Sequence, residues 1–342
     1  MRMEKDGISV IICCFNSSSR IEPTLRHLYL QQHIPIEKWE VILVDNASSD
    51  DTAAKAVVTW NSFSGIKPPI KIVNEDKQGL SFARHRGIQE SNFKFVLFCD
   101  DDNWLNENYL ADSLNIMSAQ PQIGALGGKG STVFEIAVPP HFWKNQDHVL
   151  AVGKQWKTAG DITMERGVLY GAGMVLNKTA YNILLEKYDF SFQVSDRIGE
   201  NLASSGDHEL CLALKRIGYK IFYSEDLKFE HYIPQKRTTI PYYKQLFLSF
   251  GKSDTMLMTY SLNRENYHGI KVDYRYRCLR HAKNIAKSWL RLLFTGYYTN
   301  PDKHKYIDVL HSLYGNIGSL KMTLLMKNSF KETFDKNQLF QI

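Results

Sequence analysis

Short apolar runs alternate with amphipathic runs through the first third of the chain, and this alternation constrains the fold more than any other feature. Runs such as 41–44 contain no alternating polar residue, which is typical of strands buried on both faces of a sheet. The alternation predicts an α/β fold with a mostly parallel sheet flanked by helices. We expect strands over 8–15, 39–44, 70–73 and 93–99, and helices over 19–32, 51–60, 80–89 and 106–119.

The rest of the chain divides at Pro234, after which helical periodicity predominates. We therefore expect a main domain over 1–235, made of two halves, 1–123 and 124–235, and a C-terminal helical region over 236–342. Within the second half we expect irregular structure over 124–173, a helix over 177–188, a polar loop over 191–206, a helix over 207–217, and two short strands over 220–223 and 227–231.

Composition and charge exclude several classes of protein. Five cysteines, an odd number without metal-ligand spacing, predict reduced thiols and a cytoplasmic protein. Residues 1–7 show no leader with a cleavage site, and no apolar run approaches the roughly 20 residues that span a bilayer. The formal net charge is only +6, with a basic excess over 271–305, and no nucleic-acid-binding motif accompanies it.

Three carboxylates, Asp100, Asp101 and Asp102, follow directly after the apolar run 93–99. Ligands of such sheets bind beyond the carboxyl ends of the strands. Because adjacent carboxylates repel one another, we expect a cation here, and Mg²⁺ or Mn²⁺ is commonly shared between carboxylates and substrate phosphates. The alternative is that Asp102 or Asn103 caps a helix that starts at this point.

Five segments in order resemble family 2 glycosyltransferases, which are inverting, nucleotide-sugar-dependent enzymes with a GT-A fold. The resemblance covers about residues 7–235, and it implies a nucleotide-binding half over 1–123 and an acceptor-binding half over 124–235. The resemblance makes UDP the default nucleotide of the donor. The segments are 9–16, 44–50, 79–87, 100–102, and 207–212 followed by His231.

The first three segments supply residues for the nucleotide. Phe15 and Asn16 leave the first strand where a base would lie, so Phe15 is expected to stack on the base, or else to be a core aromatic. The resemblance assigns Asp45 to the base, whereas its local sequence also suits a turn. Arg84 and Arg86 lie two apart on a predicted helix and must diverge, and the family pattern favours Arg84 as the nucleotide contact.

The resemblance also assigns different roles to the three carboxylates of the acidic cluster. It assigns Asp100 to the ribose or nucleotide and Asp102 to the metal, with Asp101 as a helper on the nucleotide side. His231, after a late strand, is a further contact to the metal or diphosphate in many members, although a lone histidine is often structural.

The base that takes the acceptor's proton is expected to be Asp207, because 205–210 resembles the family's Glu-Asp-x-Glu-Leu element. Gly206 stands where Glu is frequent, so the match is partial. Asp207 would also cap the helix that it opens. Glu209 is the reserve candidate for the base.

Together these observations predict a metal-dependent inverting hexosyltransferase, with Mn²⁺ or Mg²⁺ as cofactor. The donor would be a nucleoside diphosphate sugar and the acceptor a saccharide or lipid-linked saccharide. The basic segment 271–305 is expected either to rest on the anionic inner face of the membrane or to pack on the catalytic domain. The alternative function is an inactive nucleotide-sugar-binding or scaffolding protein. A dinucleotide dehydrogenase is excluded, because no glycine-rich loop follows the first strand.

Overall fold

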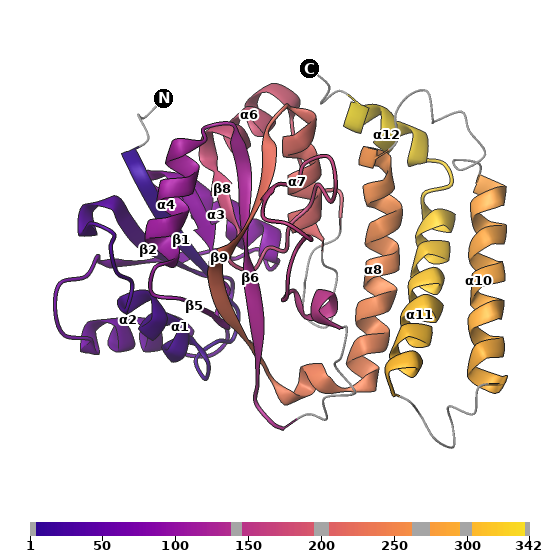
Figure 1. The fold of residues 1–342 in the computed structure, drawn as a ribbon, viewed down its shortest axis with the longest axis horizontal. Helices are drawn as coiled ribbons and strands as arrows, with labels where there is room; N and C mark the ends of the chain where they lie inside the picture. The colour runs from indigo at the N-terminus through magenta and orange to yellow at the C-terminus, as the bar shows by residue number, and fades with distance from the viewer. Residues whose placement is uncertain (1–4, 138–145, 195–204, 262–273, 295–302, 339–342) are drawn as a thin grey trace. The chain divides into compact units, whose positions relative to one another are not determined.

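The computed structural model describes residues 5–137, 146–194, 205–261, 274–294 and 303–338 (Figure 1). Internal contacts group the chain into two compact units. The first unit comprises Met1–Val133, Val149–Ser191 and Leu214–Tyr232, and the second comprises Phe134–His148, Phe192–Ala213 and Ile233–Ile342. The domain boundaries expected from the sequence stay predictions. Parts of the expected polar loop 191–206 and of the basic segment 271–305 lie outside the described residues.

Four parallel strands form the half of the sheet that the N-terminal sequence encodes. In spatial order they are β3 (Ile70–Asn74), β2 (Trp39–Asp45), β1 (Lys5–Cys14) and β4 (Phe93–Phe98). Val10 of β1 lies opposite Val41 on one side and Leu97 on the other. Because every carboxyl end points the same way, the polar residues that follow these strands share one edge.

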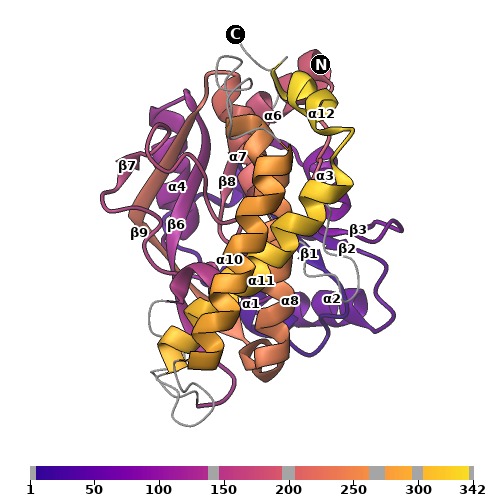
Figure 2. The same ribbon diagram turned by 90° about the vertical axis from the view of Figure 1, so that its right-hand side faces the viewer.

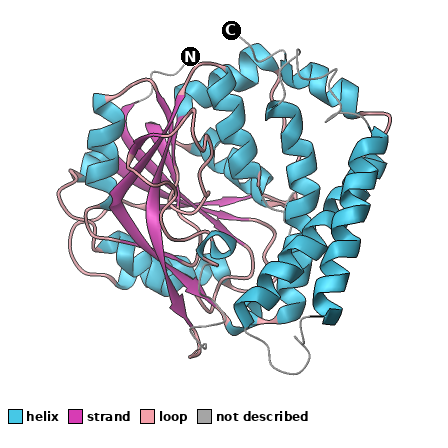
Figure 3. Ribbon diagram, turned by 45° about the vertical axis from the view of Figure 1, so that its right-hand side comes forward, coloured by secondary structure: helices cyan, strands magenta, loops and turns pink. Residues whose placement is uncertain are grey.

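The remaining strands are antiparallel, so the sheet is mixed (magenta in Figure 3). Beyond β4 the order continues with β8 (Val175–Asn177), β6 (Ile123–Phe134), β9 (Lys220–Ile233) and β5 (Asn103–Leu105), and β7 (Gly160–Asp161) pairs with β9. The α/β fold flanked by helices is confirmed.

Two local expectations are wrong. The stretch predicted as irregular contains the long strand β6. Its glycines suit close packing rather than loops, because a Cβ on Gly128 would overlap the Leu227 carbonyl oxygen. The two short strands expected near the end of the domain are one continuous strand, β9.

Helices cover both faces of the parallel strands. Alternate residues of β1 point to opposite faces. Ile8, Val10 and Ile12 join the core shared with α1 (Ile21–Tyr29), α2 (Thr52–Ser62) and α4 (Tyr109–Ala119). Ile11 instead contacts α3 (Leu80–Glu90), where a side chain on Gly87 would collide with it. The helix α6 (Lys178–Tyr188) follows β8.

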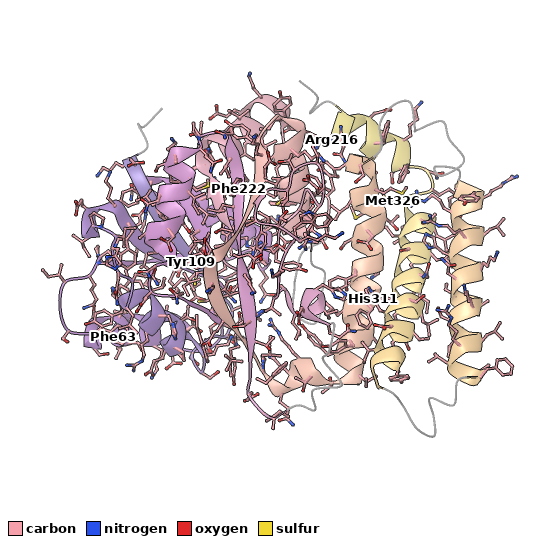
Figure 4. The ribbon with its side chains drawn as sticks, viewed as in Figure 1. Phe63, Tyr109, Arg216, Phe222, His311 and Met326 are labelled. Atoms are coloured by element: carbon pink, nitrogen blue, oxygen red, sulfur yellow. The ribbon has the colours of Figure 1, made fainter. Side chains whose placement is uncertain are left out.

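The C-terminal region is helical, as predicted. It contains α8 (Ile240–Ser261), α10 (Tyr274–Phe294), α11 (Lys303–Leu325) and α12 (Phe330–Gln338), and Figure 2 shows α8, α11 and α10 side by side. His311 of α11 faces α8 (Figure 4) and stacks on Phe247, with 4.4 Å between the ring centroids. The helix α7 (Gly206–Arg216) precedes β9. Within the described residues, no helix is both long and apolar enough to cross a bilayer.

Candidate active site

After β4 the chain turns into another strand rather than a helix. Asp100 to Asp102 form the turn, Asn103 begins β5, and α4 begins only at Tyr109. The expectation that Asp102 or Asn103 caps a helix is therefore wrong. The reason is long-range: β5 pairs with β9, and this pairing sets Asn103 directly opposite His231.

This pairing brings Asp102 and His231 together at the carboxyl edge of the first unit. The distance between Asp102 Oδ1 and His231 Nε2 is 3.5 Å, and both residues are more than nine-tenths buried. His231 Nδ1 lies 2.8 Å from the Leu150 carbonyl oxygen. Because a carbonyl only accepts hydrogen bonds, this contact requires a proton on Nδ1, and Nε2 is the ring nitrogen that faces Asp102.

A carboxylate oxygen and an imidazole nitrogen turned towards each other fit a divalent cation such as Mn²⁺. The carbonyl behind His231 is the kind of outer partner that orients a ligating histidine. Over the part of the chain that the structure describes, no three His, Cys, Asp or Glu side chains form a complete metal site. Asp102 and His231 alone would not complete the coordination sphere of such a cation.

Asp101 points into the protein. Its Oδ2 accepts hydrogen bonds from Arg20 Nη2, at 2.6 Å, and from the Ser17 hydroxyl, and its carbonyl oxygen accepts one from Thr24. Burial and the charge of Asp102 raise the pKa of Asp101, while Arg20 opposes the shift. Arg20 was not predicted as a site residue, because it lies 81 positions from Asp101 in the sequence.

Arg84 and Arg86 diverge as predicted. The Arg84 guanidinium lies 4.8 Å from the centre of the Phe98 ring, and its Nη2 lies 3.6 Å from Asp100 Oδ1. Arg86 turns to Glu90 at the surface. Among the described residues, the buried Nε of Arg84 has no hydrogen-bond partner. It is therefore an unsatisfied buried donor on a guanidinium that lies beside the acidic turn.

The other predicted nucleotide contacts lie at the ends of β1 and β2. Phe15 is 39% exposed and is not a core aromatic. Asn16 adopts a positive φ of 51°, and its Oδ1 accepts a hydrogen bond from the Ser49 amide. Asp45 Oδ1 accepts one from the Ser48 amide, so Asp45 does form the turn. Its role towards a ligand stays a prediction.

Asp207 and Glu209 belong to the second unit, on the first turn of α7. Asp207 is partly exposed, and its Oδ1 accepts a hydrogen bond from the His208 amide. Glu209 is fully buried, and its carboxylate accepts hydrogen bonds from the Gln193 and Val194 amides and the Tyr260 hydroxyl. A carboxylate enclosed in this way holds a loop, and the role of Glu209 as the reserve base stays a prediction.

The fold is the GT-A fold found in glycosyltransferases. The mannosyltransferase PcManGT from Pyrobaculum calidifontis, solved in complex with GDP-Man and Mn²⁺, has the same fold. The TM-score is 0.60 at 16% sequence identity, and the alignment covers 92% of this chain and 86% of that one.

Residues 9–165 match the family model described as Glycosyl transferase family 2. This part of the chain is therefore similar to family 2 glycosyltransferases, and the resemblance inferred from the motifs is confirmed.

Curated relatives are similar over part of their length. The amylovoran biosynthesis glycosyltransferase AmsB of Erwinia amylovora is 27% identical over 219 residues, which are 64% of this chain and 67% of that protein. The poly-β-1,6-N-acetyl-D-glucosamine synthase of Staphylococcus aureus is 26% identical over 127 residues, 36% of this chain and 29% of the synthase. The chain therefore matches less than a third of the synthase's length.

Proposed function

We propose that this protein is a metal-dependent inverting glycosyltransferase of polysaccharide biosynthesis. It would move a sugar from a nucleoside diphosphate sugar, UDP-linked by default, to a hydroxyl of a saccharide or lipid-linked saccharide. The approach of Asp102 and His231, 3.5 Å apart with the histidine proton held on the far side of the ring, carries the proposal. The two relatives are both polysaccharide enzymes by name, which supports the pathway.

The donor would lie along the carboxyl ends of β1, β2 and β4. Phe15 offers an exposed ring for stacking on the base. Asp45 and Asn16 supply acceptors for base or ribose donors, and Asp100 faces the ribose side. Arg84 Nε, buried without a partner among the described residues, would donate to a phosphate oxygen.

Asp102 and His231 would hold Mn²⁺ or Mg²⁺, and the remaining ligands would be phosphate oxygens and water. When bound, the cation neutralises charge that develops on the leaving diphosphate. The Leu150 carbonyl keeps the proton on Nδ1, so that Nε2 can act as a ligand. Asp101 would position the turn through Arg20 instead of touching the donor.

Asp207 would take the proton from the acceptor hydroxyl, because a neutral alcohol is a poor nucleophile. Its partial exposure supports this role, whereas Glu209 is enclosed. A hydroxyl that attacks the anomeric carbon opposite the leaving diphosphate inverts the configuration. An acceptor linked to lipid would require the enzyme to work at the inner membrane face.

The test is a calorimetric titration with UDP, GDP and dTDP, each with Mn²⁺ and with EDTA. We expect one nucleotide to bind only with the metal, and Asp102→Asn to weaken that binding at least tenfold. Asp189→Asn, an exposed change at a positive φ that asparagine tolerates, is the matched control. Binding unaffected by EDTA would contradict the metal assignment. Metal-dependent binding without transfer would favour the inactive nucleotide-sugar-binding alternative.

A further inference from the structure

The helix α10 has its polarity inverted relative to an ordinary surface helix. Its inward face is largely polar: Arg277 Nη2 donates to Thr323 Oγ1, His281 Nδ1 lies 2.9 Å from Asn316 Oδ1, and Ser288 bonds Ser312. Leu292 and the partly buried Ile285 are apolar exceptions, packed with α11 residues. A helix of a soluble protein normally turns its apolar stripe inward, so the outward face of α10 requires an explanation.

The outward face carries a stripe of apolar side chains. Leu279, Leu290 and Leu293 are 71%, 53% and 62% exposed, and Ala282 and Ala286 lie between them at helical spacing. From residue 279 to residue 293 the stripe is about 21 Å long, at about 1.5 Å per residue. Trp289 and Phe294, 48% and 82% exposed, extend it at its C-terminal end. Such a contiguous exposed apolar surface marks an interaction site.

Basic side chains run alongside this stripe. Arg280, Lys283, Lys287 and Arg291 are all exposed and recur at the same three- and four-residue spacing. The sequence of α10 contains no Asp or Glu. The apolar stripe and the basic row share the solvent-facing side, which is the arrangement found in helices that lie in the plane of an anionic membrane surface.

We propose that the outward face of α10 docks on an anionic bilayer, with the leucines and Trp289 entering the interface and the basic row against lipid phosphates. The basic row of α10 favours an anionic bilayer over a second copy of the chain. A symmetric contact between two α10 helices would bring two basic rows together without any acidic residue on either helix to offset them. The inference rests on the proposed function in one respect: a lipid-linked acceptor would require the enzyme to work at a membrane.

Co-sedimentation of the full chain with vesicles tests this proposal. Vesicles of phosphatidylcholine with 30% phosphatidylglycerol would be compared with pure phosphatidylcholine at low and high salt. We expect binding to the anionic vesicles, at least tenfold stronger than to the neutral ones and weakened by salt. Failure of the wild-type protein to bind anionic vesicles would overturn the proposal.

Two triple variants at exposed positions separate the charge contribution from the apolar one. Arg280→Gln with Lys283→Gln and Lys287→Gln should weaken anionic-vesicle binding about a hundredfold, since each cation near such a surface contributes about fivefold. The second triple variant, Leu279→Gln with Leu290→Gln and Leu293→Gln, should also lose binding. The matched control removes three exposed lysines elsewhere, through Lys55→Gln, Lys157→Gln and Lys187→Gln. Equal losses in the control and the α10 variants would refute a specific docking face.

The same preparations separate this proposal from the proposed function. Nucleotide titration should be unchanged in both α10 variants, which also shows that they fold. Vesicle binding without nucleotide binding would refute the donor site and leave the docking face standing. Light scattering tests whether a second copy of the chain binds this face instead. If the wild type is a dimer that the leucine variant dissociates, and no vesicle binding is seen, the face is an interface between copies and the proposal is overturned.

Discussion

Arg20 and Asp101 form a partly buried ion pair, with 2.6 Å between Nη2 and Oδ2. Asp101 is the middle member of the acidic turn, and its partner comes from the residue just before α1. One of three adjacent carboxylates is therefore neutralised inside the protein. Of the two that flank it, Asp100 lies near Arg84 and Asp102 lies near His231.

Replacing Arg20 should cost stability. Arg20→Met would leave the Asp101 carboxylate buried beside Asp102 without its cation, and we expect the free energy of unfolding to fall by about 2–4 kcal/mol. The control is Arg26→Met on the same helix, where the pair with Glu22 is exposed and contributes less than about 0.5 kcal/mol. Urea unfolding of both variants measures this difference, and similar losses would mean that the Asp101 pair adds nothing.

The two carboxylates of α7 should give opposite phenotypes. Asp207→Asn should lower kcat by at least about a hundredfold, the usual contribution of a general base, while nucleotide affinity changes less than several-fold. Glu209→Gln should instead reduce stability and leave kcat in the folded fraction within several-fold, because the amide keeps an acceptor for the Gln193 and Val194 amides. A kcat for Asp207→Asn close to wild type would rule out Asp207 as the base.

Two glycines at the contact of α8 and α11 should respond differently to alanine. A Cβ on Gly251 would overlap the Gly315 carbonyl oxygen, so Gly251→Ala must separate the two helices, at a cost of about 1–3 kcal/mol. A Cβ on Gly315 would come no closer than 3.8 Å to His311 Cδ2. Gly315→Ala should therefore stabilise the helix, by up to about 1 kcal/mol. Thermal unfolding of the pair tests the prediction, which requires the two shifts in Tm to have opposite signs.

His311 should make stability depend on pH. Burial and nearby His148 lower the pKa of His311 to about 4, although Asp308 opposes the shift. The unfolded chain binds this proton more readily, at an ordinary pKa of about 6.5. The contribution of neutral His311 to the free energy of unfolding is therefore fully present above about pH 6.5. It is lost as the pH falls towards 4, by up to about 3 kcal/mol.

The matched variants for His311 are His311→Phe, which keeps a ring against Phe247, and His33→Asn at an exposed position with a positive φ. Urea unfolding between pH 7 and pH 4 should show a shallower pH dependence in His311→Phe than in the wild type, and no change in His33→Asn. Identical slopes in all three proteins would show that His311 titrates normally.

The parallel half of the fold was predictable because local patterns determine it. The strands β1 to β4 are mainly apolar runs, and each of the expected helices forms within a few residues of its predicted bounds. The polar residues after these strands meet at one edge because parallel strands share direction. The arrangement of Arg84 towards Asp100 and Arg86 towards Glu90 follows from helical spacing alone.

What the sequence did not reveal depends on contacts between distant segments. Glycines in β6 resemble a loop until Leu227 packs against Gly128. The turn after β4 resembles a helix cap, yet pairing with β9 extends it as a strand. Nothing local to Asp101 indicates Arg20, and nothing local to His231 indicates the Leu150 carbonyl. Such relationships become visible only in three dimensions.

The register of β5 on β9 has a consequence for biosynthesis. Asn103 lies opposite His231. The carboxylate and the imidazole of the proposed metal site therefore come from segments that the ribosome synthesises at different times. While a ribosome is still translating the segment before β9, the emerging chain already holds the acidic turn but lacks its histidine. The site is thus incomplete until β9 has been synthesised and has paired with β5, and a nascent chain cannot assemble it earlier.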